Sequence, residues 1–173
     1  MEVGFSSTPE DPTGIEIDSD YAFVTDEERG LTIYSLEDPE NPDEIGHWAT
    51  PSNAQDVSLW GDYAFVADWA SGLRIINVLG DPTSPEEVGR FDTPGYATGV
   101  FVWEDTVYVA DVYTGGVIVI DASDPTNPEL IGYYDTPGQA LKVGYSDGLI
   151  FVAYLTNIGI YRFTDPTRST TQT

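Results

Sequence analysis

The chain has 173 residues, of which 40% are hydrophobic and 13% aromatic; this composition indicates a folded domain and excludes a disordered acidic tail. Asp and Glu number 30 against 6 Lys and Arg, and the net charge of −24 excludes nucleic acid and anionic membrane surfaces as partners. The absence of cysteine excludes a disulfide scaffold, a thiol nucleophile and a thiolate zinc site.

Four copies of a unit of about 43 residues follow one another along the chain. A Thr-Pro pair marks the same point of each copy, at Thr8-Pro9, Thr50-Pro51, Thr93-Pro94 and Thr136-Pro137. Short apolar runs separated by turn residues predict four strands in each unit, called a to d in chain order. No segment has the length and periodicity of a helix. A four-stranded unit repeated at this spacing predicts an all-β propeller with four blades per chain.

The unit between residues 52 and 94 shows the pattern most clearly. Its expected strands are 55–60, 63–67, 73–78 and 86–91. Gly61-Asp62 is a turn typical of a tight hairpin between strands a and b. The Asp-Pro segment 81–85 is expected to form the turn between strands c and d, because proline lacks the donor that a central strand needs.

The two ends of the chain are offset with respect to the repeat. The chain starts with a d-like strand at residues 3–6, and the last copy ends after its c strand at 158–163. We therefore expect a propeller domain over 1–166, in which strand 3–6 completes a last blade, and a polar tail over 167–173. Both a four-bladed monomer and an eight-bladed dimer joined through edge strands satisfy this pattern. Bulky residues in strand a, such as Trp60 and Trp103, favour the wider ring of the dimer.

The segments YAFVADWASGLRIINV (63–78) and VYVADVYTGGVIVIDASDPTNPELIGYYDTPG (107–138) resemble the LVIVD repeat of bacterial and archaeal cell-surface proteins. The resemblance covers four copies. It implies a β-propeller that is often exported, and it transfers no catalytic residue. The last copy departs from the others, with Tyr154 in place of an aspartate and Asn157 in place of a glycine.

Alternating strand direction places the b–c loops and the d–a connections on one face of a propeller, which by analogy with other propellers is the binding face. Acidic and aromatic residues gather there, a combination that suits a sugar, a cationic peptide or a hydrated metal ion. The candidate ligand-binding residues are Asp26, Asp68, Trp69, Asp92, Tyr96, Asp111, Tyr113 and Asp135. The structural alternative is that Asp26, Asp68 and Asp111 cap the turns that follow strand b.

The sequence contains no catalytic or metal-binding motif. The single histidine, His47, excludes a His-rich metal site, and no EF-hand loop occurs. Our first functional hypothesis is therefore a non-enzymatic binding or structural domain that contacts a protein or a carbohydrate. A calcium-dependent carbohydrate or peptide binder is the second hypothesis, and a propeller hydrolase is the third.

The charge balance also predicts the environment of the protein. A large acidic excess with a single lysine, Lys142, is typical of proteins in high salt, where ions screen the self-repulsion. A surface that loads calcium is the alternative interpretation. Residues 1–5 do not look like a signal peptide, and no apolar run reaches the roughly 20 residues of a membrane span. Together with the family resemblance, these features predict an extracellular or cell-surface domain.

Overall fold

The computed structural model describes residues 4–6, 11–113 and 116–162, which form four antiparallel sheets. The first sheet contains β1 (Pro12–Asp18), β2 (Tyr21–Asp26), β3 (Gly30–Ser35) and β4 (Asp43–Trp48). The second contains β5 (Asp56–Trp60), β6 (Tyr63–Ala67), β7 (Leu73–Asn77) and β8 (Glu86–Phe91). The third contains β9 (Tyr96–Trp103), β10 (Thr106–Val112), β11 (Gly116–Asp121) and β12 (Glu129–Tyr134). The fourth contains β13 (Ala140–Ser146), β14 (Leu149–Tyr154) and β15 (Ile158–Arg162). Within these ranges no helix is long and apolar enough to cross a membrane.

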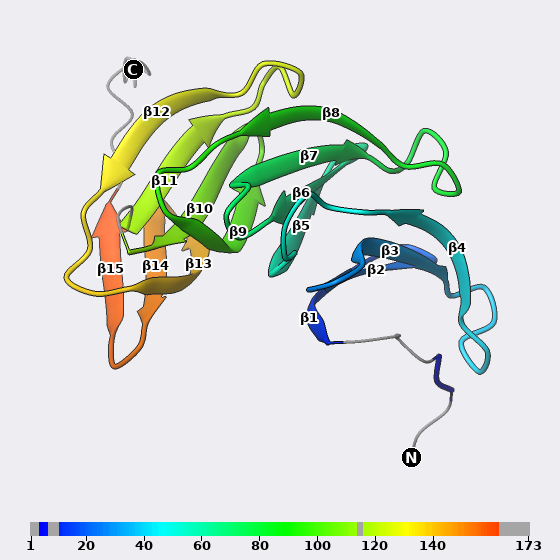
Figure 1. Cartoon of the computed structure of the whole chain (residues 1–173). Helices are drawn as coiled ribbons and strands as arrows, with labels where there is room; N and C mark the ends of the chain where they lie inside the picture. Colours follow the sequence, from blue (N-terminus) through cyan, green and yellow to red (C-terminus); the bar gives the residue numbers. More distant parts are fainter. Residues whose placement is uncertain (1–3, 7–10, 114–115, 163–173) are drawn as a thin grey trace.

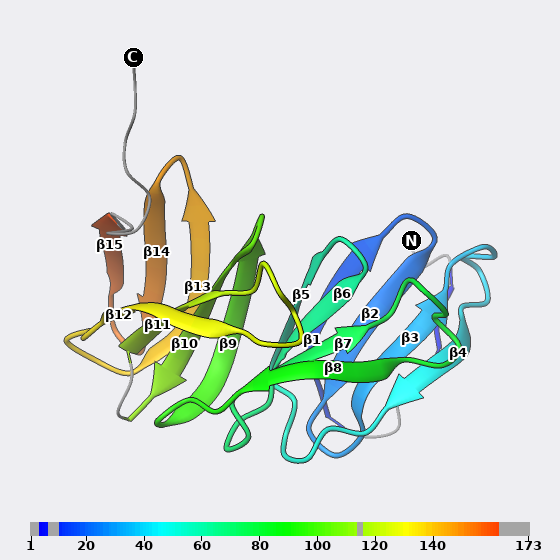
Figure 2. The same ribbon diagram turned by 90° about the horizontal axis from the view of Figure 1, so that it is seen from above.

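The sheets are arranged like successive blades of a propeller (Figure 1). In each sheet the strands pair in chain order, and the first strands β1, β5, β9 and β13 pack against one another from sheet to sheet. The sheets form an arc, with the first sheet at one end and the fourth sheet at the other in both views (Figures 1 and 2). The predicted four-stranded blade is confirmed for the first three sheets, whereas the described residues do not form a closed ring.

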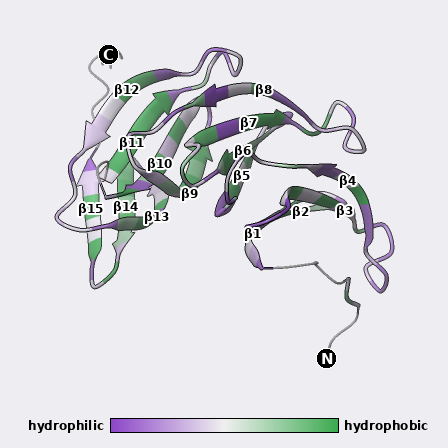
Figure 3. Cartoon of the chain, in the orientation of Figure 1, coloured by the Kyte–Doolittle hydropathy of each residue, from purple (hydrophilic) through white to green (hydrophobic). Residues whose placement is uncertain are grey.

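Strands b and c carry the core of the first three sheets. In β6 and β7 nearly every residue is buried, because both faces of these middle strands are covered by neighbouring sheets. Hydrophobic residues concentrate in the same middle strands in Figure 3, while the outer strands and turns are more polar. The a–b hairpins turn through residues with positive φ, such as Gly61 at +57°. This conformation matches the right-handed twist of the paired strands.

The boundaries of the second unit follow the sequence pattern closely. Strands 63–67 and 86–91 have the predicted limits, and β5 and β7 each differ from the prediction by one residue. The last sheet has three strands among the described residues, as the offset of the repeat implies. The predicted tail 167–173 lies outside the described residues.

Residues 4–6 do not pair with the last sheet of the same chain, which is one of the two closures that the sequence allows. Val3 lies outside the described residues, and residues 4–6 form no strand. Gly4 instead packs against the backbone carbonyl of Pro39, at the c–d turn of the first sheet. The arc places residues 4–6 beside the c–d turn of the first sheet and away from β15 (Figure 1).

Candidate binding face

The b–c loops and the d–a connections lie on one face, as the sequence predicts. Trp69, in the b–c loop of the second sheet, forms a β-bridge with Ala97 in the first strand of the third sheet. The Trp69 amide donates to the Ala97 carbonyl at 3.1 Å, and the Ala97 amide donates to the Trp69 carbonyl at 2.9 Å. These two bonds connect adjacent sheets at this face.

Three predicted aromatic residues come together at that junction. The rings of Trp69 and Tyr96 stack, with centroids 4.8 Å apart and planes 10° apart. The Tyr113 ring meets the Tyr96 ring edge to face at 5.5 Å. Tyr113 is 67% exposed and Tyr96 38% exposed, so the cluster presents aromatic surface to solvent. Such surface can stack on a sugar ring or hold a cation over its face.

Two members of this cluster have an unusual backbone. Trp69 has φ of +42° and Tyr113 has φ of +77°, in the left-handed region that bulky residues rarely occupy. Such conformations cost about 1–3 kcal/mol each and persist where the surroundings impose them. In Trp69 the two bridging hydrogen bonds to Ala97 supply that constraint.

The aspartates at the ends of the b strands are buried and bound to backbone amides. Asp26 Oδ1 accepts hydrogen bonds from the amides of Glu28 and Arg29, which is the capping role expected from the sequence. Asp68 Oδ2 accepts from the Ser52 amide, and Asp111 Oδ2 accepts from the Gly95 amide, both at 3.0 Å. Asp68 and Asp111 therefore also bind the corner that follows a Thr-Pro pair, a role that the sequence did not predict.

The second oxygen of each of these carboxylates is buried without a hydrogen-bond partner in the described part of the chain. These oxygens are Asp26 Oδ2, Asp68 Oδ1 and Asp111 Oδ1. Burial raises the pKa of Asp68 and of Asp111 above the usual value. The Thr50 hydroxyl and the Ser52 amide oppose the rise at Asp68, and the Thr93 hydroxyl and the Gly95 amide oppose it at Asp111. A buried carboxylate oxygen without a donor carries a desolvation cost that no hydrogen bond offsets.

One of these aspartates lines a cavity. A polar hollow of about 300 Å³ lies between the third and fourth sheets and is bordered by Asp111, Tyr113, Asp135 and Gln139. A second hollow of about 590 Å³ shares residues 137–139 with it and continues along Tyr154 and Asn157. The predicted residues Asp111, Tyr113 and Asp135 therefore meet around one space large enough for a side chain or a sugar ring.

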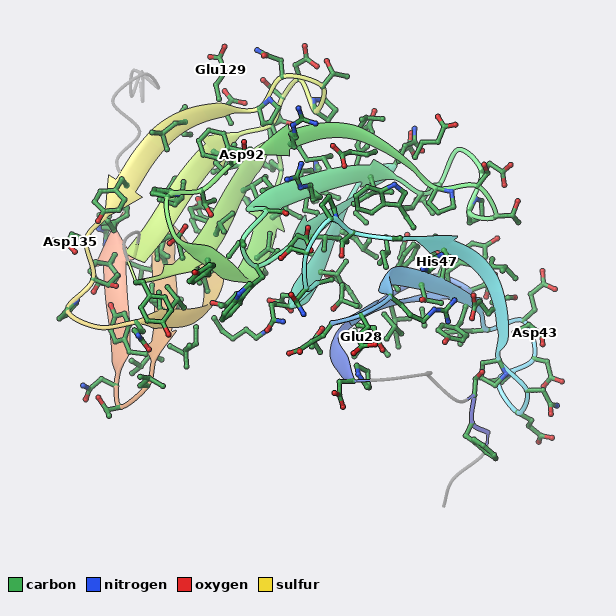
Figure 4. All side chains as sticks on the ribbon, in the orientation of Figure 1. Glu28, Asp43, His47, Asp92, Glu129 and Asp135 are labelled. Atoms are coloured by element: carbon green, nitrogen blue, oxygen red, sulfur yellow. The ribbon has the colours of Figure 1, made fainter. Side chains whose placement is uncertain are left out.

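The remaining predicted residues lie apart from this cavity. Asp26 and Asp68 occupy the corresponding positions of the first and second sheets. The Asp92 side chain is 81% exposed and lies 3.6 Å from Arg74 Nη2, and Figure 4 shows Asp92 well separated from Asp135. In the fourth sheet Tyr154 replaces the aspartate, and its hydroxyl contacts the Tyr161 hydroxyl.

Sequence reasoning missed two features. Gln139 was not predicted, although it follows the Thr-Pro-Gly corner that also borders the cavity. On the opposite face, Trp60, Trp103 and Tyr145 form a row with successive centroid distances of 6.3 and 6.0 Å. All three residues lie near the end of strand a in their units, and this shared position in the repeat could have predicted the row.

A metal centre is not formed by the described side chains on their own. Among them, no group of three or more His, Asp or Glu residues is arranged to hold a metal ion. The buried carboxylates sit in separate sheets, and each already accepts at least one backbone hydrogen bond.

The repeat and the fold can now be compared with known proteins. The family model for the LVIVD repeat matches residues 11–50, 51–93 and 94–136. The chain belongs to the LVIVD-repeat family. The three matched segments contain the first three sheets of this LVIVD-repeat propeller. No curated protein matches the chain.

Two solved structures show the same fold. The crystal structure of the computationally designed Ika4 protein superposes with a TM-score of 0.76 at 8% identity, covering 95% of this chain and 98% of Ika4. The computationally designed Ika8 protein superposes with a TM-score of 0.70 at 8% identity, covering 87% of this chain but 45% of Ika8. At such low identity the likeness concerns the fold alone.

Proposed function

We propose that this LVIVD-repeat propeller is a non-enzymatic binding domain whose ligand site is the cavity at Asp111, Tyr113 and Asp135. The observation that carries the proposal is Asp111, which borders this cavity and whose buried Oδ1 has no hydrogen-bond partner among the described residues. A ligand donor group at that oxygen would offset the desolvation of the carboxylate.

The chemistry of the site favours a cationic peptide segment. Asp111 and Asp135 offer carboxylates, and the exposed Tyr113 ring offers a face to a guanidinium or ammonium group. The net charge of −24 attracts cations to the whole surface, and the cavity supplies the specific contacts.

Binding of a dye-labelled hexa-arginine peptide, followed by fluorescence anisotropy in 1 M KCl, tests this assignment. High salt suppresses attraction to the general surface, so binding that remains depends on the cavity. We expect saturable binding that weakens about tenfold or more in Asp135→Asn and in Tyr113→Ala, the loss of one charge-assisted or cation–π contact.

The matched control is Asp105→Asn, which removes one charge from an exposed a–b turn on the opposite face. Its affinity for the peptide should equal that of the unchanged chain. Equal weakening by Asp105→Asn and Asp135→Asn, or no saturable binding, would contradict the proposal.

Calcium-dependent carbohydrate or peptide binding is the second candidate. It is favoured by the unpartnered oxygens Asp26 Oδ2, Asp68 Oδ1 and Asp111 Oδ1, since calcium binds oxygen ligands. Thermal melting with calcium, with matched magnesium and with chelator distinguishes the two candidates. A rise of the midpoint with calcium beyond that with magnesium would favour the calcium candidate.

We further propose that the domain belongs to an extracellular or cell-surface protein of a high-salt organism. Support comes from the acidic excess, with Lys142 as the single lysine, and from the family resemblance. Circular dichroism during dialysis from molar KCl to dilute buffer should show loss of β structure. A structure that unfolds or aggregates on addition of salt would contradict this expectation.

A further inference from the structure

The first sheet has an apolar face without a covering sheet. On the side away from the second sheet, a groove of about 420 Å³ is lined by apolar residues that include Ile15, Ala22 and Val24. Ile15 is 64% exposed, whereas Val57 and Val100, at the same position of the next two sheets, are 5% and 4% exposed. In those sheets the preceding sheet covers this surface. The groove is therefore an inter-sheet surface that lacks its partner.

The fourth sheet has the complementary apolar face. Ile158 and Ile160 of β15 are 68% and 59% exposed. The corresponding residues of β3, Leu31 and Ile33, are fully buried against the second sheet. We call the surface around Ile158 and Ile160 the forward surface of a sheet, and the surface around the Ile15 groove its rear surface. Where two neighbouring sheets of the chain meet, the forward surface of one packs on the rear surface of the next. The chain thus has one free forward surface and one free rear surface.

The first described residues lie where an outer strand of a preceding sheet would lie. Gly46 of β4 packs on the Pro82 carbonyl of the following sheet, and Gly89 of β8 packs on the Pro125 carbonyl. Gly4 packs on the Pro39 carbonyl in the same way, although residues 4–6 have no strand partner of their own in the described part of the chain. In β15, the edge opposite β14 has no paired strand among the described residues.

We propose that a second copy of this chain covers both surfaces, so that two chains close a ring of eight sheets with two identical joints. β15 of each copy packs Ile158 and Ile160 into the Ile15 groove of the other, and residues 4–6 of that copy extend the β15 sheet. By analogy with the pairing of Ile33 with Gly46 and of Thr32 with His47, Ile160 faces Gly4 and Gly159 faces Phe5. Ile158 faces Ser6 and the pairing ends there, because Ser6 corresponds to Trp48, the last residue of β4, which pairs with Leu31.

A second copy fits these surfaces better than the chain's own other end. The arc holds β1 and β15 apart in both views (Figures 1 and 2). A two-fold arrangement uses both free surfaces and leaves neither an apolar face nor a strand edge open.

Light scattering of the 173-residue chain in 1 M KCl tests the proposal, since salt screens the repulsion between two chains of charge −24. We expect a mass twice the 18.9 kDa of the single chain. Ile160→Asp and Ile15→Asp, one on each surface, should each return the mass to 18.9 kDa with an unchanged circular dichroism spectrum. Leu130→Asp is the matched control, because Leu130 is 55% exposed on the outer strand β12, and this variant should stay dimeric.

A disulfide distinguishes the closed ring from other assemblies. The chain has no cysteine, so a Ser6→Cys and Ile158→Cys double variant, at the pair that corresponds to Trp48 and Leu31, reports the proposed joint alone. After oxidation we expect a covalent dimer on non-reducing gels. A mass of 18.9 kDa for the unchanged chain, a disulfide within one chain, or a ladder of higher oligomers would each overturn the proposal.

Discussion

Lys142 Nζ lies 3.0 Å from Asp56 Oδ1, although the two residues belong to the fourth and second sheets. Asp56 Oδ2 also accepts a hydrogen bond from the Val100 amide in the third sheet, at 3.1 Å. One carboxylate therefore links the first strands of three successive sheets. Glu16 makes a similar bond with the Leu59 amide, and Ser58 with the Val102 amide.

Replacement of Lys142 with methionine should lower the free energy of unfolding by about 0.5 kcal/mol at low salt, because the partly exposed ion pair is lost. The effect should shrink in molar KCl, where ions screen the pair. Urea unfolding at both salt concentrations measures it. Lys142→Arg keeps the charge and serves as the control; a loss of equal size in that variant would show that packing, and not charge, is responsible.

Replacement of Gly89 with alanine should destabilise the chain by about 2–3 kcal/mol, because the new Cβ would meet the Pro125 carbonyl of the next sheet. Gly144→Ala is the matched control, since a Cβ there meets no atom within 4 Å. Thermal or urea unfolding compares the two variants. Equal stability of both would contradict the close approach of the two sheets at Gly89.

The buried Asp68 should make stability depend on pH. Burial raises its pKa above the ordinary value of 3.8, so its contribution to stability is fully present below that value and is lost as the pH rises through the raised pKa. The free energy of unfolding of the unchanged chain relative to Asp68→Asn should therefore fall between about pH 4 and pH 7. Urea titrations at both pH values in constant KCl measure this difference. A difference that grows with pH would contradict the assigned direction.

Two equivalent isoleucines should respond very differently to truncation. Ile75 is fully buried between the second and third sheets, and Ile75→Ala should cost about 3 kcal/mol. Ile160 holds the same position in β15 but is 59% exposed, so Ile160→Ala should cost much less in dilute protein, where single chains prevail. Its cost should rise with protein concentration if the second copy covers it. Urea unfolding over a range of concentrations measures both effects.

The strands within each blade could be predicted from the sequence, whereas the contacts between neighbouring blades could not. Strand 63–67 was predictable because its apolar run ends at turn residues on both sides, and the repeat supplied the other copies. The bond from Asp56 to Val100 joins residues 44 positions apart, and no periodicity within one unit indicates it. Ring closure depends on the rotation between successive sheets, which the spacing of the repeats does not specify.

The candidate site was predictable to a similar extent. Alternation of strand direction placed Trp69, Tyr96 and Tyr113 on one face, and the structure brings their rings together. Burial of Asp111 was not predictable, because aspartates at strand ends are usually exposed and because the Gly95 amide that binds it belongs to another strand connection. Which carboxylate oxygen remains unpaired depends on that three-dimensional detail.

The bonds from Glu16 to Leu59 and from Asp56 to Val100 run in one direction, from each sheet to the next along the chain. The contact between two neighbouring sheets is therefore directional: one sheet supplies the carboxylate acceptor, and the next sheet supplies the amide donor. Duplication of one unit therefore adds a sheet that already fits both neighbours, and the number of sheets in a closed ring depends on the turn at each joint. Such a fold can grow by gene duplication without any newly evolved contact surface.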